Sequence, residues 1–331
     1  MHETYFLLLC VIVLALIFDF INGFHDTATA IATSVSTRVL SPKAAVLMAT
    51  VLNLVGALSG TAVAKTVGVG LVESSCITQV TVISALIAAI AWDLITWYLG
   101  LPTSSSHALL ASIVGAAVAT AGLGVVIQKG IYKVLVALVF SPFIGFILSF
   151  FLMVFLNWLF RKSTPTLVTN IFGRLQIVSA AYMAFSHGGN DAQKTMGIIT
   201  MALVSYYHLP QFNVPLWVMI LCATAMSLGT AFGGWKIMKT IGLRLVHLRP
   251  IHGFAAQTSA ATIIEIASRL GLPLSTTHVI SSTIMGVGAS KRFSAVRWGV
   301  GGNILLAWII TLPACLVLAW IICQVLHLFI R

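Results

Sequence analysis

The sequence is poor in charged residues. Only 8% of its 331 residues are charged, with 7 acidic and 18 basic side chains, while 59% are hydrophobic. A water-soluble domain carries about a quarter charged residues, so the composition excludes a soluble enzyme and a soluble nucleic-acid-binding protein. The apolar residues form many separate runs that are long enough to cross a bilayer. We therefore predict an all-α, polytopic membrane protein with no nucleic-acid partner.

The sequence also has few signals for metal binding or processing. Its five cysteines lack the CxxC or Cys/His spacing of a metal site, so we expect small buried hydrophobic residues there. The histidines form no HExxH motif, which argues against an intramembrane metal enzyme. The apolar run at 5–20 has neither a basic segment before it nor a small-residue cleavage site. We predict a retained first membrane span and no enzymatic activity.

Hydropathy and loop residues delimit ten apolar segments. If all ten cross the membrane with the N-terminus outside, most of the 18 basic residues lie at the inner connections. This distribution follows the positive-inside rule, so we predict that both termini lie outside. The segments lie near 5–32, 43–65, 77–99, 103–122, 131–160, 175–203, 214–236, 251–270, 272–290 and 297–330.

The two halves of the chain resemble one another. Gly100–His107 reads GLPTSSSH, and Gly271–His278 reads GLPLSTTH. Upstream of these blocks, Phe20–Asp26 aligns with Phe185–Asp191 at a similar spacing. Matching blocks in the same order make chance similarity a poor explanation. The sequence therefore indicates an internal duplication.

The duplication predicts the architecture. An odd number of crossings in each half makes the two copies opposite in orientation, as in many secondary transporters. We therefore predict two inverted five-segment repeats with broken helices and helical hairpins. The first repeat covers 1–160, a short cytoplasmic connection covers 161–174, and the second repeat covers 175–331.

Two acidic residues, Asp26 and Asp191, lie at equivalent places inside apolar spans. A carboxylate there costs at least about 2.5–3.5 kcal/mol on insertion scales, so it is retained where it faces a cavity or a partner. Gly23 and the Gly188–Gly189 pair lower the helical preference just before each acid. We predict an interrupted helix with an acid at each break.

The hydroxyl-rich blocks predict an anion site. A proline fits the first turn of a helix, so new helices are expected to begin near Pro102 and Pro273. The unpaired N–H groups of a first turn attract anions. Two such ends, approaching from opposite sides, would hold one tetrahedral oxyanion with the help of the hydroxyl groups. Alternatively, the serines and threonines cap turns or bond to helix carbonyls.

A divalent anion beside two carboxylates requires a positive charge. At about 4 Å, like charges repel by roughly 4 kcal/mol at an effective dielectric constant of about 20. A bound Na⁺ or protonation of the carboxylates would remove this repulsion. The residue set therefore predicts symport of an anion with a cation, and no cofactor other than a bound Na⁺.

The motifs resemble those of the inorganic phosphate transporter (PiT) family. Asn22–Asp26 and Gly188–Asp191 are similar to its paired acidic motifs, and the two Leu-Pro-x-Ser-x-x-His blocks are similar to its hairpin motifs. The resemblance implies phosphate symport with H⁺ or Na⁺, broken helices that meet near mid-membrane, outer termini and a homodimer. The short central connection resembles compact prokaryotic members, which implies the cytoplasmic (inner) membrane.

The resemblance also implies roles for residues that match the family's motifs. His25 holds the position that Asn190 holds in the second copy. A histidine at this position makes the motif similar to that of proton-coupled bacterial members. Glu265 has an alternative role, an ion pair with Arg269 four residues later. The implied phosphate-binding residues are Ser104, Ser105, Ser106, Ser275, Thr276, Thr277 and Asn190. The implied coupling-ion residues are Asn22, His25, Asp26, Asp191, Gln257 and Glu265.

Two other transport functions stay open. A sulfate permease of the same family would use the same hydroxyl groups and helix ends. Phosphate can donate a hydrogen bond at neutral pH and sulfate cannot, so acceptors such as Asp26 and Asp191 favour phosphate. An anion channel would share the donors, but it would have no use for paired buried acids.

Other polar residues have less definite roles. Lys194 neutralises Asp191 or contacts phosphate, but the first copy has no equivalent lysine, so we expect no indispensable role. Asp93 lies among aromatic residues and is interpreted as a polar anchor at the membrane interface. His107 and His278 either shuttle protons or orient the neighbouring hydroxyl groups.

Overall fold

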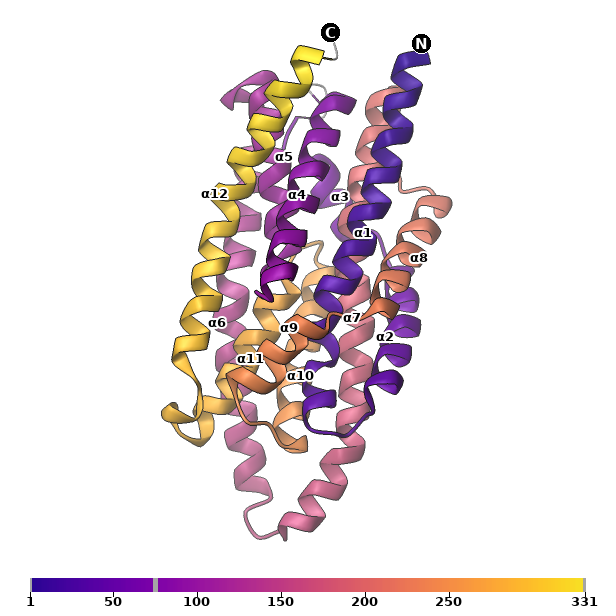
Figure 1. Cartoon of the computed structure of the whole chain (residues 1–331). Helices are drawn as coiled ribbons and strands as arrows, with labels where there is room; N and C mark the ends of the chain where they lie inside the picture. The colour runs from indigo at the N-terminus through magenta and orange to yellow at the C-terminus, as the bar shows by residue number, and fades with distance from the viewer. Residues whose placement is uncertain (1, 74–76, 330–331) are drawn as a thin grey trace.

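The structure, a computed structural model, describes residues 2–73 and 77–329, and the prediction for Cys76 lies outside them. These residues form a helical bundle whose N- and C-terminal ends lie at the same end of the molecule (Figure 1). Within the described ranges the extended structure is limited to one isolated bridge, Val72 with Val126. The α-helices are α1 His2–Ser36, α2 Pro42–Ala57, α3 Ala62–Val69, α4 Gln79–Leu99, α5 Ser105–Ala121, α6 Gln128–Leu159, α7 Pro165–Tyr207, α8 Leu216–Phe232, α9 Trp235–Lys239, α10 Pro250–Arg269, α11 Thr276–Lys291 and α12 Trp298–Phe329. Besides the five-residue α9, the structure has three short helical elements: η2 Leu123–Val125, η3 Thr240–Leu245 and η4 Phe293–Ala295.

The helices agree with a multi-pass membrane protein. By length and hydropathy, four of the described helices could cross a bilayer: α1, α4, α6 and α12. The number rises to six if two bent pairs each count as one span, α2 with α3 at 69° and α8 with α9–η3 at 60°. The prediction of an all-α membrane fold is therefore confirmed.

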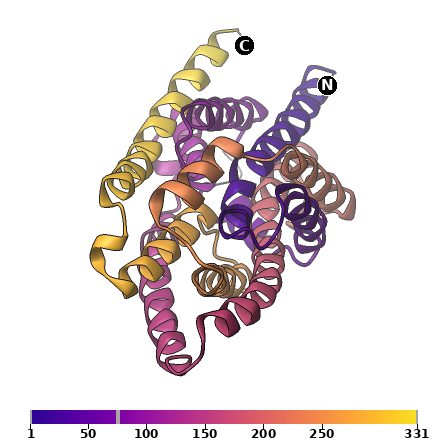
Figure 2. The same ribbon diagram turned by 60° about the horizontal axis from the view of Figure 1, so that its bottom comes forward.

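The prediction that all ten segments cross the membrane is wrong. α4 and α5 form an antiparallel pair at the end that holds the chain termini, and α10 and α11 form one at the opposite end (Figure 1). The turns of the two pairs meet inside the molecule, where the Ser106 hydroxyl donates to the Leu274 carbonyl at 2.9 Å. In the view turned by 60°, α10 and α11 lie between α6 and α7 (Figure 2). Each pair is thus a hairpin that removes two crossings, which leaves the termini at one end.

The two acidic motifs do not interrupt their helices. α1 continues through Asp26, and α7 continues through Asp191. The breaks occur between α2 and α3 and between α8 and α9 instead. Gly188 serves close packing, because a Cβ there would overlap the backbone of Asn53 in α2. The predicted helix breaks at the acids were wrong because tertiary packing, rather than local helix propensity, explains the glycines.

The connection between the halves is shorter than predicted. α6 ends at Leu159 and α7 begins at Pro165, so residues 165–174 belong to the first turns of α7. Thr164 caps α7 by accepting a hydrogen bond from the Leu167 N–H at 3.4 Å. A threonine followed by proline is a strong signal for a helix start, which the prediction of a connection at 161–174 overlooked.

Gly229 permits close contact between α8 and α1, because a Cβ there would overlap the Phe20 carbonyl. We expect Gly229→Val to destabilise the protein by about 1–3 kcal/mol, as overpacking does in other cores. Thermal unfolding of the purified protein in detergent measures this effect. Gly302→Val in α12 is the matched control, since a Cβ there meets no atom within 4 Å. Equal melting temperatures for the two variants would contradict the close packing.

Candidate functional site

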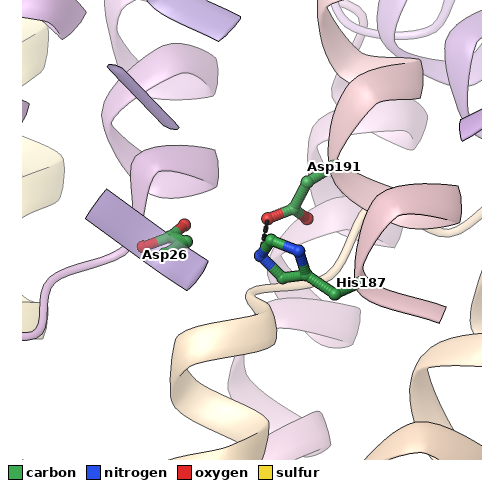
Figure 3. Close-up of side chains that lie close together, drawn as sticks. All are labelled: Asp26, His187 and Asp191. Carbon is green, nitrogen blue, oxygen red and sulfur yellow. Dashed lines mark ion pairs between the residues drawn. The ribbon is translucent and has the colours of Figure 1, made fainter. Parts of the chain in front are cut away.

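Three buried ionisable side chains from α1 and α7 lie together at the centre of the molecule. One ligand atom each from Asp26, His187 and Asp191 lies within 4.8 Å of the other two. The Nε2 atom of His187 is 3.4 Å from an Asp191 carboxylate oxygen, and Asp26 faces this pair from α1 (Figure 3). The two acids that lie at equivalent places in the two halves therefore occupy one site, and His187 joins them there.

Lys194 connects α7 to both hairpin turns. Its ammonium group is buried and donates to the Asp191 carboxylate, to the Ser106 hydroxyl and to the Leu274 carbonyl, the last at 2.8 Å. Ser106 belongs to the first hairpin and Leu274 to the second. The contact with Asp191 is one of the two roles that the sequence suggests for Lys194, and its bonds to both hairpins place it in the middle of the site. The signal was its spacing of three residues from Asp191, which puts both on one face of α7.

Hydroxyl groups of the second hairpin contact both acids. Thr276 donates to Asp191 at 3.0 Å, and Thr277 donates to Asp26 at 3.0 Å. The predicted hydroxyl block and the predicted acids are therefore parts of one site. An anion that entered here would meet hydroxyl donors and the Lys194 ammonium group beside the two carboxylates.

The first serine of each block caps its helix. The Ser104 hydroxyl accepts from the His107 N–H at 3.1 Å, and the Ser275 hydroxyl accepts from the His278 N–H at 3.2 Å. These two contacts match the alternative interpretation, in which the hydroxyl caps a turn. Ser105 differs, since its buried hydroxyl has no hydrogen-bond partner among the described residues.

His25 and Asn190, which hold equivalent positions in the two copies, contact different groups. His25 Nδ1 is 2.7 Å from the Asp26 carboxylate, and its Nε2 is 3.3 Å from the Thr96 hydroxyl in α4. Asn190 donates to the Ser268 hydroxyl at 2.8 Å and accepts from the Leu274 N–H at 3.4 Å. His25 thus extends the charged centre toward the first hairpin, while Asn190 supports the turn of the second.

Gln257 and Glu265 do not join the cluster of acids. Gln257 donates to the Ser34 hydroxyl at 2.9 Å and accepts from the Ser179 hydroxyl at 3.0 Å. Glu265 accepts from Arg269 Nε at 2.8 Å, so the alternative ion pair is present. In this conformation both residues join α10 to neighbouring groups, and their predicted coupling-ion role stays a prediction.

The two hairpin histidines, His107 in α5 and His278 in α11, lie against one another. The rings of His107 and His278 have centroids 4.4 Å apart, and His278 stacks on Trp308 of α12 at 3.8 Å. This contact ties the two hairpins to each other and to α12. Proton transfer and orientation of the hydroxyl groups both stay open as roles for this pair.

Two further acids are buried near the centre. Asp93, predicted at the membrane interface, is fully buried in α4, so that prediction was wrong. Asp19 in α1, which the sequence analysis overlooked, is also fully buried. The oxygens of both carboxylates lack hydrogen-bond partners in the part of the chain that the structure describes, as does Asn22 Oδ1. The signal for Asp19 was its position seven residues before Asp26, two turns away on the same helix face.

The fold and the site together define a membrane transport protein. Ionisable side chains inside membrane segments mark substrate or ion pathways, and helix ends that meet at mid-membrane are typical of transporter binding sites. The profile of the phosphate transporter family matches residues 22–319. The chain belongs to this family, which confirms the resemblance found in the sequence.

Individual relatives agree with this assignment. The chain is 50% identical over 310 residues to the "Probable low-affinity inorganic phosphate transporter" of Bacillus subtilis (strain 168), covering 93% of each chain. It is 48% identical over 310 residues to the protein of the same name in Rhizobium meliloti (strain 1021), again covering 93% of each. A solved structure, "The sodium-dependent phosphate transporter", is 27% identical with a TM-score of 0.91 and covers 98% of this chain and 100% of its own. The protein is therefore a transporter and not an enzyme.

Proposed function

We propose that the protein is a secondary active transporter that carries inorganic phosphate together with a coupling cation, H⁺ or Na⁺, by alternating access. The observation that carries this proposal is the meeting of Asp26, Asp191 and Lys194 with the hairpin hydroxyl groups in one buried centre. Membership of the phosphate transporter family supports phosphate as the substrate. The solved relative, named as sodium-dependent, supports coupling to a cation.

The chemistry of the centre suits phosphate. Ser106, Thr276 and Thr277 offer hydroxyl groups, and Lys194 offers a positive charge. Hydrogen bonds between charged and neutral partners of this kind are stronger than those between neutral groups. An ionised carboxylate nearby can accept a hydrogen bond from the protonated oxygen of phosphate, whereas sulfate has no such proton at neutral pH. The centre therefore favours the binding of phosphate over that of sulfate.

The charge balance of the centre requires the coupling cation. Lys194 is one fixed positive charge beside the carboxylates of Asp26 and Asp191. A phosphate dianion would add further negative charge in a region of low dielectric constant, where unbalanced charge is costly. Na⁺ at the carboxylates, or protons on them, would compensate that charge. Binding of the cation and of phosphate would then favour one another, which is the basis of symport.

The wider architecture is proposed as two inverted repeats, 1–160 and 175–331, in the cytoplasmic membrane. Each half contains in order a long helix, a bent helix pair, a hairpin and a long helix with an internal proline. The hairpins enter from opposite ends (Figure 1). The α1–α2 and α6–α7 connections, which carry Arg38, Arg161 and Lys162, lie at the end away from the termini, so we place the termini outside. The family resemblance also implies a homodimer, which cross-linking in membranes would test.

Uptake into proteoliposomes tests the function. We expect labelled phosphate to accumulate when the outside has the higher proton concentration or the higher Na⁺ concentration. Sulfate is expected to be a weaker substrate. The purified wild-type protein and protein-free liposomes are compared under each gradient. Uptake that responds to neither gradient would contradict symport. A high anion conductance that needs neither the pH gradient nor the Na⁺ gradient would indicate a channel. Preferred uptake of sulfate would favour the sulfate permease.

A further inference from the structure

Asp19 is a buried acid that the proposed binding site does not use. It lies in α1 with an exposed fraction of 0%. Neither of its carboxylate oxygens has a hydrogen-bond partner among residues 2–73 and 77–329. An ionised carboxylate in such surroundings is strongly disfavoured. A sequence retains an acid of this kind inside a membrane protein mainly where the acid has a function.

The position of Asp19 relates it to the charged centre. Asp19 precedes Asp26 by seven residues, two turns of α1, so the two acids lie on one face about 10 Å apart along the helix axis. Asn22 lies between them on that face, and its Oδ1 also lacks a partner in the described ranges. Since α1 begins at the end that holds the termini (Figure 1), Asp19 is nearer to that end of α1 than Asp26 is.

The helices that pack against α1 offer Asp19 no cation at contact distance. Thr195 of α7 and Cys222 of α8 lie near its carboxylate without a hydrogen bond to it in this structure, and the charged groups of α7 that face it are Asp191 and Lys194. The ammonium group of Lys194 is already bonded to Asp191. The titratable Asp93 of α4 lies near the His25–Asp26 pair. Thr195, one turn beyond Asp191, has a buried hydroxyl group with no partner in the part of the chain described.

These surroundings fit a proton better than a metal ion. Hard cations such as Ca²⁺ and Mg²⁺ bind through about six or more oxygen ligands, whereas the unpartnered oxygens near Asp19 are its own two, Asn22 Oδ1 and the Thr195 hydroxyl. A proton needs a single carboxylate oxygen, and the neutral carboxyl group then suits an apolar environment. The Thr195 hydroxyl can accept a hydrogen bond from the protonated acid.

We propose that Asp19 carries a proton in the transport cycle, as a protonation site separate from the Asp26–Asp191 centre. In the conformation open to the side of higher proton concentration, hydronium transfers a proton to a carboxylate oxygen and leaves water. The neutral carboxyl group is then enclosed, as in this structure. When the opposite side opens, water takes up the proton and the carboxylate is restored. One proton thus moves per cycle in addition to any ion at the centre, an inference that rests on the proposed phosphate symport.

Asp19→Asn tests this proposal, because asparagine matches the shape of the protonated acid and cannot release a proton. Two measurements on proteoliposomes are compared: phosphate accumulation driven by a pH gradient, and exchange of labelled for unlabelled phosphate at equal pH. Each coupled proton supports about tenfold accumulation per pH unit of gradient. We therefore expect the variant to lose about a factor of ten in accumulation at one pH unit, while exchange is retained.

Two further variants serve as controls. Asp19→Glu keeps an ionisable group and is expected to keep accumulation driven by the pH gradient. Glu73→Gln removes an exposed acid and should change neither measurement. Retained exchange also shows that Asp19→Asn folds and binds phosphate.

Three results would overturn the proposal. The first is wild-type accumulation by Asp19→Asn at the same pH gradient. The second is equal loss of exchange and accumulation in that variant, which would indicate a structural or binding role. The third is a wild-type protein driven by Na⁺ alone, which would refute proton transfer at Asp19 and leave phosphate symport intact. A wild-type protein that takes up no phosphate under any gradient would refute the proposed function and this inference together.

Discussion

Asp191→Asn is expected to reduce phosphate uptake at least about a hundredfold. The variant keeps the shape of the side chain but removes the charge that pairs with Lys194 and accepts from Thr276. A lost hydrogen bond to a charged group costs about 1.5–3 kcal/mol, so loss of both contacts at the site corresponds to about a hundredfold or more, because each 1.4 kcal/mol is about a factor of ten. The initial rate of labelled phosphate uptake into proteoliposomes under an imposed pH or Na⁺ gradient measures the effect.

The charge lost in Asp191→Asn needs a control outside the site. Glu73→Gln removes one acidic charge from an exposed side chain and should leave the rate of uptake unchanged. Size-exclusion profiles and melting temperatures of the purified variants separate loss of transport from loss of folding. Uptake by a folded Asp191→Asn variant at the wild-type rate would disprove the role of Asp191 in the site.

The residues that could be predicted from the sequence are those that the duplication repeats. Asp26 and Asp191 were identified because each half carries one acid in an apolar span, and the hydroxyl blocks were identified because they occur twice. The structure brings both sets together through Thr276 and Thr277. Duplication thus predicts which residues meet, even though the sequence contains no direct information on distance.

Groups that occur in one half only were missed or underrated. Lys194 has no equivalent in the first copy, and Asp19 has none in the second. Their importance arises from tertiary contacts, because Lys194 reaches two hairpins that are far from it in the chain. Asp93 was misplaced because neighbouring tryptophans are typical of the membrane interface, and burial by other helices cannot be recognised from local composition.

Hydropathy could not separate a hairpin from a pair of crossing helices. α4 is 21 residues long and apolar enough to span a bilayer, although it turns back with α5 inside the molecule (Figure 1). Each turn contains a left-handed glycine, Gly100 or Gly271, and the two hairpins from opposite halves meet at the Ser106–Leu274 hydrogen bond. Segment length and composition describe each helix separately, whereas this contact depends on both halves.

Lys194→Met is the second variant for which we expect a loss of uptake of about a hundredfold or more, because it removes hydrogen bonds from a charged group that are worth about 1.5–3 kcal/mol each. Methionine keeps the apolar stem and removes the ammonium group, which leaves Asp191 without its cation and removes the bonds from α7 to the Ser106 hydroxyl and the Leu274 carbonyl. The first and second hairpin turns would then lose a common contact. Labelled phosphate uptake measures the loss, and Lys65→Met, at an exposed position in α3, is the matched control.

The double variant Asp191→Asn/Lys194→Met distinguishes a functional pair from two independent groups. Residues that act as one unit give effects that are far from additive. Since Asp191 and Lys194 neutralise one another in the buried centre, removing both leaves no unpaired charge. We expect the double variant to be no more impaired in uptake, and no less stable to heat, than the worse single variant. A double variant whose loss equals the product of the two single losses would show that the lysine and the acid act separately, and that Lys194 contributes to transport through the hairpin turns alone.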